Sequence, residues 1–332
     1  MTTLVDRLWY RRGRPLAILW PLALAYRHIA HQRRDRALAY AARHPVAAPV
    51  IVVGNITAGG TGKSPLTAWL VRMLRRHGWR PVILTRGYGG KAADYPLRVT
   101  ATTDSRASGD EPLMLAQQCN CPVVVDPDRN RAAQWALAQH LGDVLVCDDG
   151  LQHYRLPRDI EIAVFDGARG VGNGAPIPVG PMREPLSRLR SVDFVITNGQ
   201  ARAELAHGRS FLMTLQPTTL RHLGTGELQP VTRLAGQRVR AVAGIGNPGR
   251  FFDTLSALGA RVRGRALPDH HRFAADDLLT EPDELLLMTA KDAVKCRAIA
   301  PVNTWVLEVE AVLDKSFEPG LLERLAELGY TR

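Results

Sequence analysis

The fold is decided by the stretch Val50-Ile51-Val52-Val53-Gly54-Asn55-Ile56-Thr57-Ala58-Gly59-Gly60-Thr61-Gly62-Lys63-Ser64. It begins with an apolar, β-branched run that is typical of a buried strand, and it continues as a glycine-rich loop. After Pro65, apolar residues recur at helical spacing, so the predicted order is strand, loop and helix. In this order the loop N–H groups and the positive end of the helix point at one place, which suits the oxygens of a phosphate chain.

The glycine-rich loop matches a variant of the P-loop pattern. Thr57 stands where the strict pattern has its first glycine, and the residues from Gly59 onward read Gly-Gly-Thr-Gly-Lys-Ser. In a P-loop, Lys63 would reach the β- and γ-phosphates and Ser64 would ligate Mg²⁺. The sequence therefore predicts a site for a nucleoside triphosphate, formed by Asn55, Thr57, Gly59, Gly60, Thr61, Gly62, Lys63 and Ser64.

A pair of carboxylates ends a second apolar strand. The run from residue 143 to residue 147 leads directly into Asp148 and Asp149. P-loop enzymes hold Mg²⁺ with acidic residues at such a strand end, directly or through water, opposite the hydroxyl of the loop. We expect a metal site formed by Ser64, Asp148 and Asp149, with the alternative that one of the two carboxylates only caps the next turn.

Further apolar strands alternate with helical segments along the chain. This alternation predicts an α/β fold with a P-loop NTPase-type, mostly parallel sheet flanked by helices, together with a second, smaller α/β domain and an N-terminal amphipathic helical arm. The expected limits are 1–45 for the membrane-associating arm, 46–205 for the P-loop nucleotide-binding domain, 206–235 for linker strands and 236–332 for the C-terminal α/β domain.

Positive charge is concentrated at the N-terminal end. The chain has a formal net charge of +11, and residues 1–45 contain nine arginines against two aspartates. The apolar run 16–26 lies between arginines, but it is shorter than the roughly 20 residues that a bilayer-spanning helix needs. We expect an interfacial helix pair on an anionic membrane surface, or alternatively a helix packed on its own protein. A nucleic-acid partner is not expected, because no nucleic-acid module accompanies the charge.

Composition sets two further limits. A chain of 332 residues is long enough for two domains that each bury a core. The four cysteines show neither metal-ligand spacing nor a disulfide framework, which is typical of a protein in a reducing cytoplasm.

Three loops that follow predicted strands carry candidate substrate residues. Arg86 and Tyr88 come after the strand 81–85, and ligands of open α/β sheets bind beyond the carboxyl ends of the strands. Arg129 and Arg131 lie at the start of a later helix, where a guanidinium group would suit phosphate oxygens. The Gly/Pro-rich loop 170–185 is long for a compact domain, so we expect it to bind the acceptor.

Two segments are candidates for a catalytic base. Asp110 precedes Pro112 at the start of a predicted helix and is well placed as the N-cap of that helix. In the second half, Asp269, His270 and His271 follow a strand, and zinc is not expected there because no third ligand has suitable spacing. A histidine at this place could orient a catalytic carboxylate, or it could be an exposed turn residue.

Three classes of function agree with these features. The first is a membrane-surface kinase that acts on an amphiphilic acceptor. The second is a membrane-bound P-loop ATPase switch of the partitioning type, but such proteins normally carry lysine where this chain has Ala58. The third is a dinucleotide oxidoreductase, which would depend on the Gly-x-Gly-x-x-Gly pattern from Gly244 to Gly249. Pro248 is awkward in a dinucleotide loop, so we expect a simple strand-to-helix turn there.

Seven ordered blocks of the sequence together resemble the tetraacyldisaccharide 4′-kinase family of lipid A synthesis. They are residues 53–65, 85–90, 109–112, 148–153, 181–185, 243–248 and 291–295. The resemblance implies ATP and Mg²⁺ as cofactors and phosphorylation of the 4′-hydroxyl of a tetraacyldisaccharide 1-phosphate. It also implies peripheral attachment to the cytoplasmic face of the inner membrane, with the lipid A disaccharide precursor and the anionic membrane surface as partners and no obligate protein partner inferred.

The resemblance also implies roles for individual residues. Lys63 matches the family's phosphate-binding lysine, and Asp110 matches its general base. In the family this base is paired with a histidine. The register of the sequence favours His270 for this role, and His271 remains the alternative. Arg183 matches an arginine of the family's acceptor loop, and Arg129 or Arg131 is expected to contact a phosphate. Tyr88 is expected near the substrate from its place in the loop after the strand 81–85.

Overall fold

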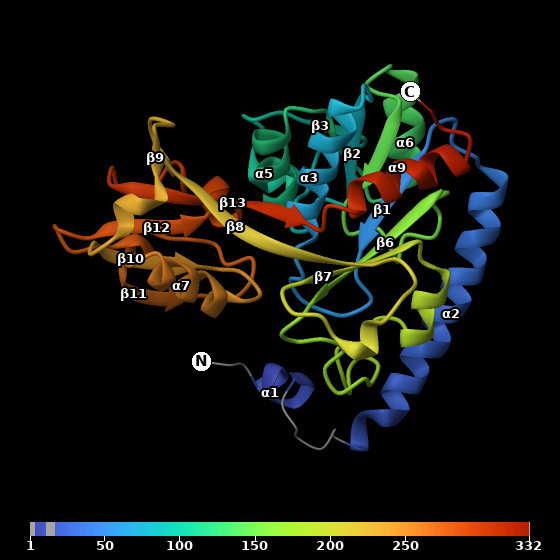
Figure 1. The fold of residues 1–332 in the computed structure, drawn as a ribbon, viewed down its shortest axis with the longest axis horizontal. Helices are drawn as coiled ribbons and strands as arrows, with labels where there is room; N and C mark the ends of the chain where they lie inside the picture. Colours follow the sequence, from blue (N-terminus) through green and yellow to red (C-terminus); the bar gives the residue numbers. More distant parts are fainter. Residues whose placement is uncertain (1–3, 11–16, 332) are drawn as a thin grey trace.

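The computed structural model describes residues 4–10 and 17–331 of the 332-residue chain, and it has two halves of unequal size (Figure 1). The larger half contains β1 to β7 and the helices around them. The smaller half contains β9 to β12 together with α7. Two long strands, β8 (Ser210–His222) and β13 (Thr304–Leu313), run from one half into the other.

The other strands have the following bounds: β1 Val50–Gly54, β2 Pro81–Thr85, β3 Leu97–Val99, β4 Val123–Val125, β5 Val144–Cys147, β6 Ile160–Asp166, β7 Phe194–Asn198, β9 Leu228–Pro230, β10 Arg238–Ala243, β11 Arg261–Ala266 and β12 Leu285–Thr289. The helices are α1 Leu4–Tyr10, α2 Trp20–Arg43, α3 Lys63–Arg76, α4 Ser105–Ser108, α5 Asp110–Cys119, α6 Arg129–Ala138, α7 Pro248–Ala257, α8 Ala290–Cys296 and α9 Phe317–Glu327. Short 3-10 turns are η1 Ala17–Leu19, η2 Leu186–Ser191, η3 Ala203–Leu205, η4 Val231–Leu234 and η5 Ala275–Leu278.

One sheet passes through both halves. Among the described residues its strands follow the order β11-β10-β12-β13-β8-β7-β6-β1-β5-β2-β4-β3, with β9 paired to β8 beside this path. The strand β1, which leads into the P-loop, pairs in parallel with β5 and β6 at the centre of the larger half. The pairs β3–β4, β8–β9 and β8–β13 are antiparallel. The predicted α/β fold with a mostly parallel sheet is therefore confirmed.

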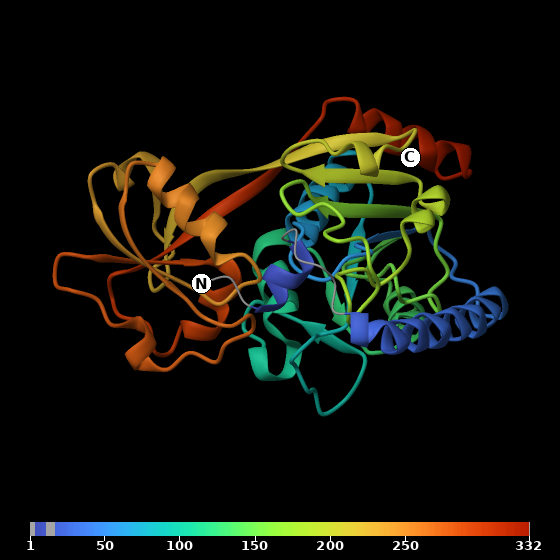
Figure 2. The same ribbon diagram turned by 90° about the horizontal axis from the view of Figure 1, so that it is seen from below.

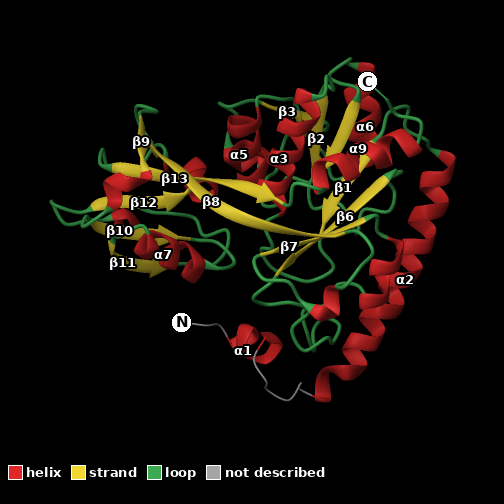
Figure 3. Ribbon diagram, viewed as in Figure 1, coloured by secondary structure: helices red, strands yellow, loops and turns green. Residues whose placement is uncertain are grey.

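Helices cover both faces of the sheet in the larger half (Figure 3). On one face, Leu70 of α3 and Leu115 of α5 pack with Ile51 of β1. On the other face, Ala132 of α6 packs with Val52 of β1. All five residues of β1 are buried, which agrees with an uninterrupted apolar run rather than an alternating one.

Two elements, β8 and α9, contact parts of the protein outside the domains that the sequence predicts for them. The expected linker, 206–235, contains β8, which pairs with β7 of the larger half and with β13. Helix α9 falls within the expected C-terminal domain, but its Phe317 packs in the core of the larger half, against Trp69 and Phe194. The division of the chain into folding domains remains a prediction, and α9 belongs by contact to the larger half.

The N-terminal arm lies against the larger half, with α2 on the side that faces away from the smaller half (Figure 2). The Trp9 indole N–H donates a hydrogen bond to the carbonyl of Pro178 at 3.1 Å. The Tyr26 hydroxyl donates to the carbonyl of Arg183 at 3.3 Å. In the part of the chain that the structure describes, no helix is both long enough and apolar enough to cross a membrane. Residues 11–16 of the predicted arm lie outside the described residues.

The prediction that Asp110 caps a helix is wrong. Helix α5 begins at Asp110 itself, and Gly109 is the N-cap residue, with a φ of 85°. A β carbon on Gly109 would lie 2.6 Å from the carbonyl oxygen of Tyr88, so the close approach of two loops requires glycine there. The carboxylate of Asp110 instead faces His270 and Lys295 across the junction of the two halves.

The predicted strand-to-helix turn after Ala243 is confirmed. Strand β10 ends at Ala243, α7 begins at Pro248, and the Asn247 side chain caps α7 by accepting a hydrogen bond from the N–H of Arg250. Proline is well suited to the first turn of a helix, because its missing N–H would have no partner there.

Candidate active site

The P-loop connects the carboxyl end of β1 to the start of α3. Its backbone is held by side chains, because Asn55 Nδ2 donates to the carbonyl of Gly59 at 3.2 Å and Asn198 Nδ2 donates to the carbonyl of Thr61 at 3.1 Å. Gly62 has a φ of 99°, and a β carbon there would lie 2.8 Å from Asn198 Nδ2. The loop is therefore pre-formed, with Lys63 as the first residue of α3.

Thr57, the residue at which the loop departs from the strict pattern, lies beside the end of the loop 170–185. It forms an antiparallel bridge with Met182, and the N–H of Ala58 donates to the carbonyl of Pro181 at 2.8 Å. The first part of the P-loop thus pairs with the end of the loop 170–185. The expected acceptor loop is tied directly to the nucleotide loop.

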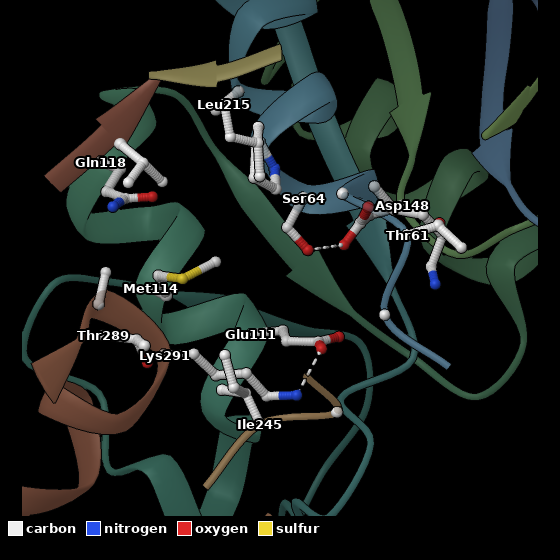
Figure 4. A pocket seen from close by; sticks show the side chains of 18 of the residues that line it. Thr61, Ser64, Glu111, Met114, Gln118, Asp148, Leu215, Ile245, Thr289 and Lys291 are labelled. Atoms are coloured by element: carbon white, nitrogen blue, oxygen red, sulfur yellow. Dashed lines mark hydrogen bonds and ion pairs between the residues drawn. The ribbon is translucent and has the colours of Figure 1, made fainter. Parts of the chain in front are cut away.

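The metal-site candidates Ser64 and Asp148 lie together, as Figure 4 shows. Ser64 Oγ donates to Asp148 Oδ2 at 3.2 Å, and Thr67 Oγ1 donates to Asp148 Oδ1 at 2.9 Å. Burial, together with the nearby carboxylates of Glu111 and Asp149, raises the pKa of Asp148 to about 7. A buried carboxylate with this tendency to take up a proton is suited to a site where a cation binds.

Asp149 has a different environment, although it is the next residue. Its Oδ1 lies 3.5 Å from Lys63 Nζ and 3.5 Å from Arg183 Nη1. Burial by itself would raise the pKa of Asp149, but Lys63 and Arg183 outweigh it and hold this pKa below its usual value. A φ of 50° at Asp149 turns the chain between the two carboxylates, so that they face different partners.

The base candidates Asp110 and His270 are brought into contact from distant parts of the chain. His270 Nδ1 lies 3.4 Å from Asp110 Oδ2. His271 is turned away, and its Nε2 lies 2.9 Å from Asp277 Oδ2. The structure thus pairs Asp110 with His270, the histidine that the register of the sequence favoured.

Three ionic contacts beside this pair, made by two lysines, were missed in the sequence. Lys291 Nζ lies 2.9 Å from Glu111 Oε1, a contact that Figure 4 shows as a dashed line. The same Nζ lies 3.2 Å from Asp269 Oδ1. Lys295 Nζ lies 3.5 Å from Asp110 Oδ2. Both lysines and Glu111 are contained in the blocks 109–112 and 291–295, so membership of those blocks was the signal that could have identified them.

Arg183 of the loop 170–185 reaches the P-loop end of the cleft. Besides Asp149, its Nη1 lies 3.4 Å from Gln152 Oε1. Gln152 Nε2 in turn donates to the carbonyl of Asn55 at 2.9 Å and to Glu184 Oε1 at 2.7 Å. Tyr154 and Arg188 also contact Glu184. This network fixes the end of the loop 170–185 relative to the P-loop.

The two other substrate candidates, Tyr88 and Arg129, both line the cleft but differ in their exposure to solvent. Tyr88 is 62% exposed, and its ring centroid is 4.8 Å from that of His270. Arg129 is 3% exposed, and its Nε is buried without a hydrogen-bond partner among the described residues. Burial lowers the pKa of His153 to about 3, with a further contribution from the charge of Arg129. Arg129 and a neutral His153 both line the cleft.

Both halves line a cleft of about 1190 Å³ that contains the P-loop, Asp148, Asp149, His270 and Lys291. A second groove of about 1790 Å³ runs along α2. Four side chains belong to both hollows, namely Arg129, Gln152, His153 and Arg183. A long acceptor in the groove could thus place one end beside the P-loop.

The P-loop on its strand, the facing carboxylates and the Asp110–His270 pair define a P-loop phosphotransferase. The family model for tetraacyldisaccharide-1-P 4′-kinase, LpxK, matches residues 15–326. The chain belongs to this family and is therefore a lipid kinase.

Several relatives share nearly the whole chain. The tetraacyldisaccharide 4′-kinase of Pseudomonas aeruginosa (strain LESB58) is 47% identical over 326 residues, with 96% of each chain covered. The corresponding protein of Azotobacter vinelandii is 46% identical over 332 residues, with 98% of each chain covered. The crystal structure of LpxK from Aquifex aeolicus in complex with ATP is 27% identical, with a TM-score of 0.77, and the match covers 95% of this chain and 99% of that one.

Proposed function

We propose that the protein transfers the γ-phosphate of ATP to the 4′-hydroxyl of a tetraacyldisaccharide 1-phosphate, the lipid A disaccharide precursor. Family membership over residues 15–326 supports this activity. The observation that supports the site assignment is that the P-loop and His270 line one cleft, with Asp110 in contact with His270. The ATPase switch is not favoured, because the relatives are named as 4′-kinases.

The residues at the P-loop fit Mg²⁺. Magnesium is usually bound through one or two carboxylates together with water and substrate phosphates. Ser64 and Asp148 supply a hydroxyl and a carboxylate, and no cluster of three or more His, Cys, Asp or Glu side chains in the described residues could hold a metal by itself. This agrees with an ion held largely by the nucleotide. When bound, Mg²⁺ would neutralise charge on the phosphates.

In the proposed chemistry, the Asp110–His270 pair accepts the proton of the acceptor hydroxyl. Asp110 takes the proton of the 4′-hydroxyl as that oxygen attacks the γ-phosphorus, and the bond from the γ-phosphorus to the bridging oxygen of ADP breaks. His270 orients the carboxylate, because its Nδ1 lies 3.4 Å from Asp110 Oδ2. Lys63 neutralises charge on the transferred group, so that positioning and electrostatics supply most of the rate.

The acceptor would approach along the groove beside α2. Arg183 and Arg129 line both the groove and the cleft. Their guanidinium groups are suited to bind phosphate oxygens of a substrate that extends from the groove into the cleft. Tyr88 stands beside His270 on the opposite wall, where a sugar ring could lie against its phenol ring. These three roles follow from position in the cleft.

The arm supports attachment to a membrane surface. Ile18 is 83% exposed and Leu22 is 59% exposed, and the same segment carries exposed arginines such as Arg33 and Arg36. Exposed apolar side chains beside arginines are suited to the boundary between acyl chains and anionic head groups. We expect a peripheral protein on the cytoplasmic face of the inner membrane, where both ATP and the lipid acceptor are accessible.

The test is transfer of label from γ-labelled ATP to the lipid A disaccharide precursor in mixed micelles. Label should appear on the 4′-position of the lipid in proportion to added protein, and Lys63→Ala should remove most of this transfer. ATP hydrolysis that is indifferent to the lipid, with no labelled lipid formed, would contradict the proposal and favour the ATPase switch.

A further inference from the structure

The ammonium group of Lys295 is buried between two carboxylates. Its side chain is 10% exposed, and Nζ lies 2.9 Å from Asp292 Oδ1 and 3.5 Å from Asp110 Oδ2. Nζ makes no hydrogen bond of acceptable geometry with any described residue. The ring of Phe273 covers it, with 4.9 Å between Nζ and the ring centroid. A charged group in such a place is retained at a cost in desolvation.

Asp292 is already occupied by the backbone of the smaller half. Its Oδ2 accepts hydrogen bonds from the N–H of Gly244 at 3.0 Å and from Thr289 Oγ1 at 2.8 Å. Asp292 therefore anchors Lys295 from the side of α8 and cannot move toward Asp110 without breaking these bonds. The remaining contact of the ammonium is the carboxylate of Asp110 on α5, in the other half of the molecule.

Lys295 and His270 contact the same oxygen of Asp110. His270 Nδ1 lies 3.4 Å from Oδ2, and Lys295 Nζ lies 3.5 Å from it. The other ionisable groups that face this point come from α5, α8, the loop after β11 and η5, and they are Glu111, Lys291, Asp292, Cys296, Asp269 and Asp277.

We propose that Lys295 is a positioning residue that keeps the carboxylate of Asp110 ionised and directed at His270. The inference rests on the proposed role of Asp110 as the base. The ammonium favours the charged form of the carboxylate beside it, because opposite charges at this separation in a desolvated place attract strongly. The carboxylate beside His270 is thereby kept in the form that can accept a proton.

The experiment is the pH profile of kcat for Lys295→Met, which removes the charge and keeps the length of the side chain. Without the ammonium the desolvated carboxylate takes up a proton more readily, so the acidic limb of the profile should move upward by about one pH unit or more. The KM for ATP should change less than about twofold, because Lys295 does not face the P-loop. Lys295→Arg, which keeps the charge, should leave the acidic limb near its wild-type position.

Two controls separate positioning from a purely structural role. Lys315→Met makes the same chemical change at an exposed lysine of the C-terminal segment and should leave the profile unchanged. In an Asp110→Asn background, Lys295→Met should change kcat by less than about twofold, because the residue acts through Asp110. If Lys295→Met does not fold, Lys295→Gln is measured in its place.

An acidic limb that does not move in the charge-removing variant, or a full loss of kcat that persists in the Asp110→Asn background, would overturn the role of Lys295. Undiminished turnover by Asp110→Asn alone would instead overturn the assignment of the base. A wild-type protein that labels no lipid would overturn the kinase function itself. The three results are distinct, so each proposal is tested separately.

Discussion

Adjacent residues at this site have opposite surroundings. His270 has a φ of 59°, and this left-handed conformation turns its ring toward Asp110 while His271 points to Asp277. Asp148 and Asp149 are separated in the same way, with a φ of 50° at Asp149. The left-handed conformation is uncommon for residues with a side chain, and its two occurrences here separate a functional group from its neighbour.

The two histidines provide a matched pair of variants. His270→Gln should lower kcat by about 10²-fold or more, because the partner of the proposed base is lost. His271→Gln should retain activity within a few-fold, since its ring contacts Asp277 outside the cleft. Steady-state turnover of the lipid acceptor measures both. Equal losses in the two variants would contradict the pairing of Asp110 with His270.

The raised pKa of Asp148 has a consequence for stability. With its folded pKa near 7, against about 4 when unfolded, the native state binds more protons than the unfolded state between these values. For protein free of nucleotide and metal, this group therefore lowers the free energy of unfolding as pH rises from about 4 to about 7. Asp148→Asn should stabilise that form at pH 8 by on the order of 2 to 4 kcal/mol, while it removes kinase activity.

Asp149 is the control for this prediction, because its pKa is lowered rather than raised. Its ionised form contributes stability that is present above the unfolded pKa and lost on acidification, so Asp149→Asn should destabilise the protein at pH 8. Urea denaturation at pH 5 and pH 8 measures both variants. A destabilised Asp148→Asn at pH 8 would show that burial of this charge is not unfavourable.

Among the secondary-structure elements, α9 shows that the two halves are not built from two consecutive pieces of chain. Strand β13 carries the chain back from the smaller half, and α9 then packs its fully buried Phe317 against rings of the larger half. The nucleotide site is thus supported by the last element of the chain, close to the helix α3 that begins at the P-loop.

Phe317→Ala tests this dependence. Removing a fully buried phenyl ring leaves a cavity, so the free energy of unfolding should fall by about 3 to 5 kcal/mol. Val312→Ala, at a position that is 43% exposed on β13, should change it by less than about 1 kcal/mol. Chemical denaturation monitored by fluorescence gives both values. A loss as small as that of the exposed variant would mean that α9 is not part of the core.

Across the whole molecule, the arm and the cleft lie on connected surfaces. The arm contacts the loops of the site through Trp9 and Tyr26, and the groove along α2 shares residues with the cleft. Deleting the arm would therefore disturb the loop 170–185 as well as the proposed membrane attachment. Exposed side chains of the arm provide a cleaner test than truncation.

Ile18→Ser combined with Leu22→Ser should weaken flotation with anionic vesicles by about tenfold or more, because two exposed apolar side chains no longer enter the acyl boundary. Raised salt should weaken binding of the wild-type protein too, since attraction between arginines and head groups is screened. The same double change at Leu228 and Val302, exposed residues of the smaller half, is the control. Unchanged flotation of the arm variant would contradict the proposed surface.

Local sequence was sufficient for the parts of this protein that are built from neighbouring residues. The apolar run of β1, the glycine-rich loop and the helix after Lys63 predict a P-loop, because strand, turn and helix preferences act within a few residues. The strand β5, which ends just before Asp148, is recognisable for the same reason. The confirmed fold class and family rest on such segments in order.

Only the tertiary structure decided how the distant groups meet. Asp110 and His270 are 160 positions apart, and their contact depends on β8 and β13 carrying the smaller half to α5. The capping prediction for Asp110 failed because local pattern cannot show that Gly109 must fit beneath Tyr88. Lys295 was overlooked for a similar reason, since a lysine in a helix is usually solvated. Its burial between two carboxylates exists only once both halves are in place.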